Sequence, residues 1–371
     1  MKYFLIAGER SGDLHGSNLI AAIRAQDSTA EIQGWGGDLM KKAGMETLVS
    51  LEELAFMGFW EVIRNLRSIL KLKKTCQIHL AEYQPDALVL IDYSGFNLRI
   101  AQWAKKRGIR VFYYIAPKVW AWNTGRVKSF PSKIDHLFCI FPFEVEFFKK
   151  HQFFPVEYVG NPLVDAMSRF VPSQSILQSK PVLALLPGSR KQEVLAALPL
   201  MLEATRHFSD LQPIVAKVSN LPSSLYEVFE KQYPNVKWVL DDTYELLSCS
   251  SVAVVTSGTA TLETAWFQVP QVVVYRTSWL SYEIARRLIK VPFISLVNLV
   301  MEEQVVTELI QSDFQTSRVV EEITKLLPGS QYRVKQAQKL SELRAKLGDP
   351  GASFRVGHRI VQLINSSKQP L

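Results

Sequence analysis

The sequence predicts an α/β protein of two doubly wound domains that face each other across a cleft, with a helical C-terminal tail. Short apolar runs alternate with longer amphipathic stretches, which is the pattern of βαβ units around parallel sheets. The chain has 371 residues, enough for two domains at about 150 residues each. Apolar residues make up 47% of the chain and charged residues 21%, which excludes disordered and fibrous proteins.

Ten apolar runs are expected to form strands, five before residue 142 and five after residue 181. Most end in a turn that contains Gly, Ser, Pro or Asp and leads into a helical pattern. Functional side chains in doubly wound sheets follow the carboxyl ends of strands, so a site is expected in these turns. The expected strands are Tyr3–Ala7, Glu31–Trp35, Ala87–Ile91, Val111–Ile115, His136–Ile140, Val182–Leu186, Gln212–Lys217, Val236–Leu240, Val252–Thr256 and Gln271–Tyr275.

A polar stretch, Met167–Lys180, separates the two sets of strands and is expected to be the linker. The expected domains are therefore residues 1–168 and 169–330. From residue 317 the pattern is helical. The last segment, residues 331–371, is expected to pack back toward the first domain or onto a partner subunit, and a homodimer through these helices is one expectation. The helices expected here are Val319–Leu327, Tyr332–Leu347 and Ser353–Asn365.

The charge of the chain favours an anionic partner. Lysine and arginine number 43 against 35 acidic residues, a net charge of +8, which suits a nucleotide, a phospholipid surface or nucleic acid. The three cysteines have no C-x-x-C spacing, so neither a disulfide framework nor a zinc site is indicated. Because no signal peptide or membrane-spanning run is evident, we expect a cytoplasmic protein that lies on a membrane if it meets one.

The first motif, Gly8-Glu9-Arg10-Ser11-Gly12-Asp13, follows the first expected strand and begins a helix. Ser11 or Asp13 is expected to cap that helix, whose free N–H groups favour an anion or a polar sugar. The alternative is a capped turn without a ligand. Two carboxylates would repel a pyrophosphate, so a dinucleotide is disfavoured.

The second motif places Asp92 at the end of a wholly apolar strand. Burial in a cleft would raise the pKa of this carboxyl and make it a plausible general base. Capping of the next helix is the alternative.

The third motif is a strand, a glycine turn and a helix start that contains Gly188, Ser189, Arg190 and Glu193. Backbone N–H groups, the Ser189 hydroxyl and the Arg190 guanidinium are expected to bind a phosphate, and Arg190 to neutralise a leaving diphosphate. An ordinary exposed turn is the alternative. The lysine and spacing of a P-loop are missing, which disfavours nucleotide hydrolysis.

The fourth motif places Ser257, Gly258 and Thr259 at a helix start, with Glu263 about one turn further on. The helix end can donate to phosphates, while Glu263 can accept from the two ribose hydroxyls. The alternative is a Ser/Thr-rich cap with Glu263 as a solvated acid.

The fifth motif, residues 56–74, is a basic amphipathic segment. One helical face carries the basic residues, and apolar residues including Phe59 occupy the other, with Trp60 beside them, a pattern typical of helices that lie in lipid headgroups. The alternative is a surface helix that packs on the core. The basic residues are Arg64, Arg67, Lys71 and Lys74. A related aromatic and basic stretch is expected to line the mouth of a site for an acceptor substrate. It contains Lys118, Trp120, Trp122, Arg126 and Lys128.

Together these motifs resemble the lipid-A-disaccharide synthase family, inverting glycosyltransferases with two Rossmann-like domains, the GT-B fold. The resemblance covers essentially the whole chain, with Arg10 and Ser94-Gly95 as departures. The motifs that carry it are Gly8-Glu9-x-Ser11-Gly12-Asp13, Met57-Gly58 with Glu61-Val62, Ile91-Asp92 with Phe96-Asn97, Pro117-x-Val119-Trp120-Ala121-Trp122, Leu186-Pro187-Gly188-Ser189-Arg190-x-x-Glu193, Ser257-Gly258-Thr259-Ala260-x-Leu262-Glu263 and Ser295-Leu296-x-Asn298-Leu299.

The resemblance implies transfer of 2,3-diacylglucosamine from UDP-2,3-diacylglucosamine to the 6-hydroxyl of 2,3-diacylglucosamine 1-phosphate, with release of UDP. It implies Asp92 as the base with Asp13 as its rival, and neither a metal nor another cofactor. Residues 1–168 would bind the acceptor lipid and residues 169–330 the UDP-sugar, at the cytoplasmic face of the inner membrane. The residues assigned to UDP are Gly188, Ser189, Arg190, Glu193, Ser257, Gly258, Thr259, Glu263 and Asn298; those assigned to the acceptor or the cleft are Glu9, Ser11, Gly12, Trp120 and Trp122.

Two other functions stay open on the sequence. A UDP-sugar 2-epimerase of similar architecture would also need the phosphate turn and the ribose glutamate, but it has no use for a lipid-facing helix. A non-catalytic membrane or nucleic-acid binding protein would use only the positive charge, and no motif requires nucleic acid.

Overall fold

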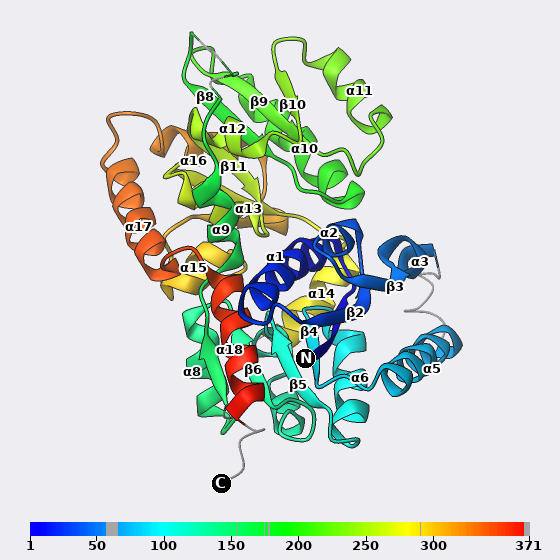
Figure 1. Cartoon of the computed structure of the whole chain (residues 1–371). Coiled ribbons are helices and arrows are strands. Elements are labelled where there is room, and N and C mark those ends of the chain that lie inside the picture. The colour runs from blue at the N-terminus through cyan, green and yellow to red at the C-terminus, as the bar shows by residue number, and fades with distance from the viewer. Residues whose placement is uncertain (57–65, 154, 174, 177–178, 290, 367–371) are drawn as a thin grey trace. The chain divides into compact units, whose positions relative to one another are not determined.

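The computed structural model describes residues 1–56, 66–153, 155–173, 175–176, 179–289 and 291–366. The chain forms two compact units: residues 1–165 with the segment from Asp349 onward, and Ala166–Gly348. Each unit holds one parallel sheet with helices against it (Figure 1). The predicted α/β class is confirmed.

The first unit is built on a seven-stranded sheet. Its strands are β1 (Lys2–Ala7), β2 (Glu31–Gly36), β3 (Glu46–Ser50), β4 (Ala87–Ile91), β5 (Arg110–Tyr114), β6 (His136–Cys139) and β7 (Val156–Tyr158). They pair in the order β3-β2-β1-β4-β5-β6-β7, and every pairing is parallel. The central strands β1, β4 and β5 are almost entirely buried, as their continuous apolar runs predict.

Helices cover both faces of this sheet. They are α1 (Arg10–Gln26), α2 (Asp38–Lys42), α3 (Leu51–Phe56), α5 (Leu66–Tyr83), α6 (Ser94–Lys105), α7 (Val119–Trp122), the 3₁₀ helix η1 (Thr124–Ser129), α8 (Pro142–Lys150), the start of α9 (Pro162–Arg169), and α18 (Ala352–Ser366). Successive strand side chains point to opposite faces. Phe4 and Ile6 therefore pack with α5, α6 and α8, whereas Tyr3 and Leu5 pack with α1 and α18.

The second unit is built on a six-stranded parallel sheet. Its strands are β8 (Val182–Leu186), β9 (Gln212–Lys217), β10 (Lys237–Leu240), β11 (Ser250–Thr256), β12 (Gln271–Tyr275) and β13 (Glu308–Ile310), in the order β10-β9-β8-β11-β12-β13. Its helices are α10 (Lys191–Thr205), α11 (Ser224–Gln232), α12 (Thr243–Ser248), α13 (Ala260–Trp266), α14 (Trp279–Leu288), α15 (Leu296–Met301), η2 (Gln311–Asp313), α16 (Thr316–Lys325) and α17 (Gln331–Leu347). Apolar side chains of α10 and α16 cover one face of the sheet, and those of α12 cover the other.

The expected strands are all present, and three further strands lie at sheet edges. These are β3, β7 and β13, which pair on one side only. Each is short and largely half-buried, so its sequence shows no continuous apolar run.

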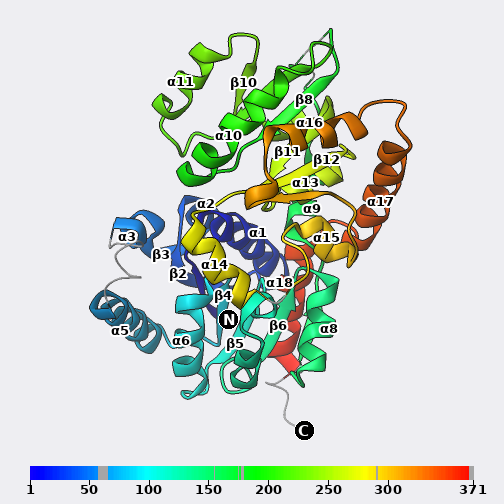
Figure 2. The same ribbon diagram turned by 180° about the vertical axis from the view of Figure 1, so that it is seen from behind.

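The C-terminal segment that was expected as one piece, residues 331–371, divides at Gly348 between the two units. Helix α17 packs on α13 and α15, while α18 lies along α1 (Figures 1 and 2). The close approach of α18 requires Gly357, because a Cβ there would lie 2.7 Å from the Cβ of Ala22. The expected boundary between the two domains follows residue 168, and the observed division lies between Asp165 and Ala166.

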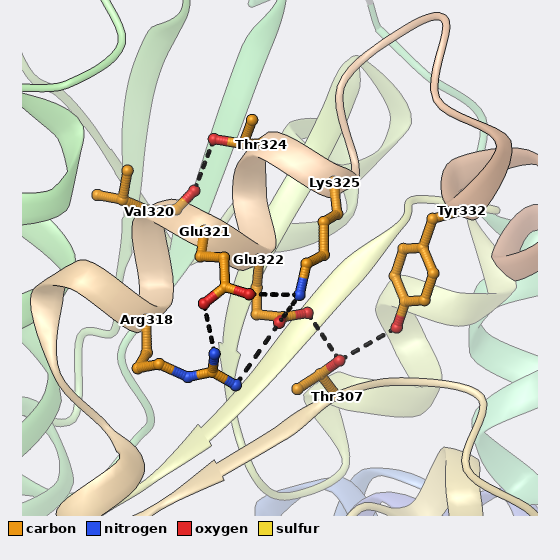
Figure 3. Close-up of polar contacts among 8 residues, drawn as sticks. All are labelled: Thr307, Arg318, Val320, Glu321, Glu322, Thr324, Lys325 and Tyr332. Carbon is orange, nitrogen blue, oxygen red and sulfur yellow. Dashed lines mark hydrogen bonds and ion pairs between the residues drawn. The ribbon is translucent and has the colours of Figure 1, made fainter.

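A buried carboxylate fastens α16 and the start of α17 to the segment before β13 (Figure 3). Glu322 is 3% exposed and accepts a hydrogen bond of 2.8 Å from the Thr307 hydroxyl. Because that hydroxyl has one proton, Tyr332 is the donor in its 3.1 Å contact with Thr307. The Lys325 ammonium pairs with the Glu322 carboxylate at 2.7 Å, and the Arg318 guanidinium forms a longer ion pair with the same carboxylate. The charged groups of this network pair with one another, so the network has a structural role.

Candidate active site

Each sheet reverses its strand order once, and the loops that follow the strands at these two points hold four of the predicted motifs. The reversal lies between β1 and β4 in the first unit and between β8 and β11 in the second. Ligands of doubly wound sheets bind at such switch points, outside the carboxyl ends of the strands. The motifs there begin at Gly8, Asp92, Gly188 and Ser257.

Asp92 and Tyr93 follow β4 in a backbone conformation that side chains other than glycine seldom adopt. Their φ angles are 48° and 47°, both in the left-handed region. The carbonyl oxygen of Asp92 accepts hydrogen bonds from Asn97 Nδ2 at 2.8 Å and from the Tyr113 hydroxyl at 2.5 Å. Strained residues held in this way cluster at functional sites. Sequence reasoning quoted Asn97 in a motif but gave it no role, and it missed Tyr113.

The carboxyl group of Asp92 is suited to accept a proton. Burial raises its pKa above the ordinary value, and the charge of Lys118 and the N–H of Tyr93 offset only part of that effect. A buried carboxylate with a raised pKa is a stronger base than a solvated one. A raised pKa is the property that a general base needs, and the backbone N–H of Tyr93 donates to this carboxyl.

Asp13, the rival base, has its carboxylate occupied. Its oxygens accept hydrogen bonds from the backbone N–H groups of Gly37, Leu39 and Met40, at 2.9, 3.1 and 3.0 Å. These groups lie at the start of α2, and Asp13 itself is 6% exposed. Asp13 thus fastens α2 to α1, which is a structural role and weakens its candidacy as a base.

The remainder of the first motif forms the start of α1. Glu9 is the N-cap residue and makes no side-chain cap, so the expected cap by Ser11 or Asp13 is wrong. Gly12 packs against Ala7, where an added Cβ would lie 3.2 Å from the alanine Cβ. Glu9 and Ser11 stay exposed at the carboxyl end of β1, where a ligand can reach them.

The two tryptophans of the aromatic stretch differ in environment. Trp122 is 46% exposed, whereas Trp120 is buried and donates from Nε1 to Glu144 Oε1 at 3.0 Å. Burial raises the pKa of Glu144 to about 7, and its other oxygen accepts the N–H groups of Ile140 and Phe141. Trp120 therefore orients a buried carboxyl at the end of β6. Glu144 was not predicted from the sequence. Its position, three residues into a helix start, is the signal that could have identified it as a capping residue.

In the second unit, Glu193 occupies the N–H groups that were expected to bind a phosphate. Its Oε2 accepts from Ser189 N at 3.1 Å and Arg190 N at 3.2 Å, and its Oε1 pairs with Arg190 Nη1 at 2.9 Å. The expectation that these amides are open to a phosphate is therefore wrong in this structure. The Arg190 side chain, 79% exposed, remains accessible to an anion. Gly188 has a φ of 105°, and a Cβ there would lie 2.5 Å from Glu193 Oε2.

The start of α13 is open beside Gly258. A Cβ added to Gly258 would meet nothing within 4 Å. Ser257 is fixed by its neighbours, since its N–H donates to Val274 O at 3.0 Å and its hydroxyl to Ile294 O at 2.9 Å. Thr259 is the N-cap residue and makes no side-chain cap. Ser257 therefore shapes this loop, while Gly258 and Thr259 border the open space.

Glu263 is not the solvated helix acid of the alternative interpretation. The Tyr244 hydroxyl donates to its Oε1 at 3.2 Å, and burial raises the pKa of the carboxyl. The Tyr244 ring lies edge-on to Phe170 and also contacts Phe267. Sequence reasoning missed Tyr244, which comes from a helix with no motif of its own.

Asn298 has its amide fully used inside the second unit. Nδ2 donates to Val306 O and Glu308 Oε1, both at 2.9 Å, and Oδ1 accepts from the N–H groups of Val305 and Val306. The side chain is completely buried. Asn298 therefore holds the turn before β13. Its amide has no free hydrogen-bonding group for the expected contact with UDP.

Of the predicted membrane segment, the structure describes only the part in α5. Phe59, Trp60 and Arg64 lie outside the described residues. Arg67 belongs to α5 by its backbone, and Lys71 and Lys74 are exposed on that helix. Leu70 and Ile78 are exposed beside these lysines, at 58% and 45%, whereas the buried residues are Leu72, Cys76 and Leu80. No helix in the described ranges combines the length and apolarity needed to cross a bilayer.

Two doubly wound units with motifs at both switch points define a protein with the GT-B fold. Solved structures share this fold at 13% identity: a UDP-GlcNAc 2-epimerase from Neisseria meningitidis has a TM-score of 0.67 and covers 98% of this chain and 100% of its own. The calicheamicin glycosyltransferase CalG4 has a TM-score of 0.66, with 99% of each chain covered. At this identity the likeness shows the fold alone.

Sequence comparisons give the family. The profile described as Lipid-A-disaccharide synthetase matches residues 3–355. The lipid-A-disaccharide synthase of Geobacter metallireducens is 37% identical over 99% of this chain and 98% of its own, and that of Coxiella burnetii strain CbuG_Q212 is 36% identical over 98% of both. The chain belongs to the lipid-A-disaccharide synthase family and is a glycosyltransferase. The epimerases share only its fold, and a non-catalytic role is not supported.

Proposed function

We propose that this enzyme transfers 2,3-diacylglucosamine from UDP-2,3-diacylglucosamine to the 6-hydroxyl of 2,3-diacylglucosamine 1-phosphate, forming a β-1,6-linked disaccharide and UDP. The observation that carries the proposal is the family match over residues 3–355, with relatives at 36–37% identity over nearly the whole chain.

Asp92 is the base in this mechanism. The acceptor 6-hydroxyl loses its proton to the Asp92 carboxylate while its oxygen bonds to the anomeric carbon of the donor, and the bond from that carbon to the diphosphate breaks. Attack on the face opposite the leaving UDP inverts the anomeric centre. Asn97 and Tyr113 support this step through the Asp92 carbonyl, because they fix the backbone that aims the carboxylate.

The second unit binds the donor. The exposed Arg190 guanidinium neutralises the charge that grows on the leaving diphosphate, and the open loop at Gly258 and Thr259 admits the phosphates. Glu263, held by Tyr244, accepts hydrogen bonds from the ribose hydroxyls. Because a guanidinium supplies positive charge, the proposed mechanism uses no metal ion and no cofactor.

The acyl chains of both substrates place the reaction at the cytoplasmic surface of the inner membrane. Drawing an acyl chain into water costs about 0.8 kcal/mol per CH₂. Lys71 and Lys74 would meet lipid phosphates while Leu70 enters the headgroup layer, which matches their exposure on one side of α5.

A homodimer through the C-terminal helices is also part of the proposal. Phe354 of α18 is 52% exposed and could contact the same helix of a second copy. Sedimentation velocity of the wild type and Phe354→Ser tests it: a wild-type dimer that dissociates in the variant supports this role, and two equal monomers refute it.

The activity is tested with purified enzyme, the UDP-sugar and the acyl sugar phosphate, by measuring UDP and disaccharide together. The proposal predicts that UDP release requires the acceptor and equals disaccharide formation. UDP release without acceptor would instead match a hydrolytic or epimerase-like reaction and would reject the transfer.

Membrane binding is tested by sedimentation with anionic vesicles. Lys71→Glu with Lys74→Glu should weaken binding at least about 30-fold, given about 1 kcal/mol per lysine near the surface. Lys231→Glu with Lys335→Glu makes the same change in charge at exposed positions of the second unit and serves as the control. Equal binding of both double variants would reject a role for α5.

A further inference from the structure

Three basic side chains lie on the connection between β5 and β6, and the proposed reaction as stated so far does not use them. Lys118 follows β5 and is exposed; Arg126 lies in η1 and Lys133 just after it, both half-buried. Strands β4 and β5 are neighbours in the sheet, so this connection begins, at Lys118, on the edge that also presents Asp92.

Hydrogen bonds link the Lys133 side chain to the backbone of Arg126 through Ser129. Lys133 Nζ donates to Ser129 Oγ at 3.0 Å, and Ser129 Oγ donates to the carbonyl oxygen of Arg126 at 2.8 Å. Burial and the charge of Arg126 lower the pKa of Lys133, so the two cations are close enough to repel. A folded protein keeps such a pair at a cost, and a bound anion would remove the repulsion.

Two of these cations, Lys118 and Arg126, lie close to the proposed base. The charge of Arg126 acts on Tyr113, whose hydroxyl donates to the Asp92 carbonyl oxygen, and the charge of Lys118 acts on the carboxyls of Asp92 and Glu144. Lys118 and Arg126 therefore border the region beside Asp92, and Lys133 is the neighbour of Arg126.

Some cations of the first unit have carboxylate partners. Lys105 pairs with Asp135 at 2.6 Å, and Arg359 with Glu157 at 3.1 Å. Within the described ranges of this unit, Lys118, Arg126 and Lys133 form no such ion pair. Unpaired basic groups on one concentrated surface attract a multiply charged anion.

The geometry points to a phosphomonoester site formed by Lys118, Arg126 and Lys133, which holds the phosphate of the sugar-phosphate acceptor while Asp92 receives the proton from its hydroxyl. This inference rests on the proposed function and assigns the acceptor phosphate to named residues. The nucleophilic 6-hydroxyl and the 1-phosphate lie at opposite ends of one sugar ring, so a phosphate anchored here orients the hydroxyl relative to Asp92.

The test compares two acceptors, 2,3-diacylglucosamine with and without its 1-phosphate, in the wild type and in Lys118→Met, Arg126→Met and Lys133→Met. Loss of a charge-assisted hydrogen bond predicts that KM for the phosphorylated acceptor rises about 10- to 100-fold. KM for the acceptor without phosphate and KM for the UDP-sugar should stay unchanged. Lys118→Arg should restore most of the affinity, and Lys106→Met, an exposed lysine at the opposite end of α6, is the control.

Several outcomes would overturn the inference while leaving the proposed function intact. Equal use of both acceptors by the wild type is one such outcome, and an equal loss with both acceptors in the variants is another. A rise in KM for the UDP-sugar would assign the cations to the diphosphate. Weaker vesicle binding as the only change would assign them to lipid headgroups.

A second measurement does not depend on turnover. The ³¹P signal of inorganic phosphate should broaden with wild-type enzyme and much less with Lys118→Met/Arg126→Met. Equal broadening by the wild type and the variant refutes the site, even if no acceptor yields a disaccharide. Failure to form a disaccharide with any acceptor would by itself reject the proposed function.

Discussion

The side-chain amide of Asn97 donates a hydrogen bond of 2.8 Å to the carbonyl oxygen of Asp92. Its second contact, at 3.3 Å, is to the carbonyl oxygen of Ile91, so one buried side chain holds two consecutive carbonyls at the end of β4. Asp92 and Tyr93 adopt left-handed φ angles there, and each such residue costs roughly 1–2 kcal/mol. The backbone of the proposed base is therefore held in position by a fully buried side chain.

Asn97→Ala should lower kcat about 10-fold or more while KM for the UDP-sugar stays unchanged, because the strained turn loses a donor and Asp92 loses its orientation. Unfolding in urea should show a loss of about 1–3 kcal/mol, the cost of unpaired buried carbonyls. Arg99→Ala, at an exposed position of the same helix, is the control. An unchanged kcat in Asn97→Ala would show that the turn does not need this support.

Asp13→Asn should destabilise the protein by about 2–3 kcal/mol, since an amide oxygen replaces a carboxylate that accepts three backbone N–H groups. Urea unfolding measures this loss. Asp38→Asn changes an exposed acid in the first turn of α2 and should leave stability within about 0.5 kcal/mol. If Asp13→Asn kept full stability but lost turnover, Asp13 would be the better candidate for the base.

The pH dependence of kcat at saturating substrates should show an acid limb that belongs to Asp92. A protonated carboxyl cannot accept a proton, so kcat falls as pH drops through the Asp92 pKa, which burial raises. Because the charge of Lys118 lowers that pKa, Lys118→Met should move the limb to higher pH. Lys106→Met should leave it in place. A limb that moves to lower pH in Lys118→Met would contradict this assignment.

Gly188→Ala and Gly258→Ala should separate folding from donor binding. Gly188 has a φ of 105° and contacts Glu193, so the alanine variant should lose about 2–3 kcal/mol in urea unfolding. Gly258 has open space beside it, so Gly258→Ala should stay stable while KM for the UDP-sugar rises several-fold. A stable Gly258→Ala with unchanged KM would remove this loop from the donor site.

The sequence predicted the central strands well because they are buried on both faces. Ala87–Ile91 and Val182–Leu186 are continuous apolar runs, and their observed bounds match the expected ones. The edge strands β3, β7 and β13 escaped prediction, since strands that pair on one side need less apolar sequence. The division of residues 331–371 depends on long-range packing, such as α18 on α1, that no local pattern encodes.

Four of the predicted motifs lie at the switch points of the two sheets, and several of their side chains make contacts that the sequence did not predict. Asp92 was singled out at the end of an apolar strand and Glu263 near a helix start. The pKa of each carboxyl is raised by burial. Asp13 and Asn298 were assigned functional roles, yet their side chains bind distant backbone groups. Which hydrogen bonds a polar side chain makes depends on neighbours far along the chain, and spacing alone does not show them.

The kcat of Asp92→Asn in acceptor-dependent UDP release tests the central claim most directly. The account predicts a loss of at least about 100-fold with an unchanged urea midpoint, because the amide keeps the size of the side chain but cannot take the proton. A variant that keeps kcat within about threefold of the wild type would contradict Asp92 as the base.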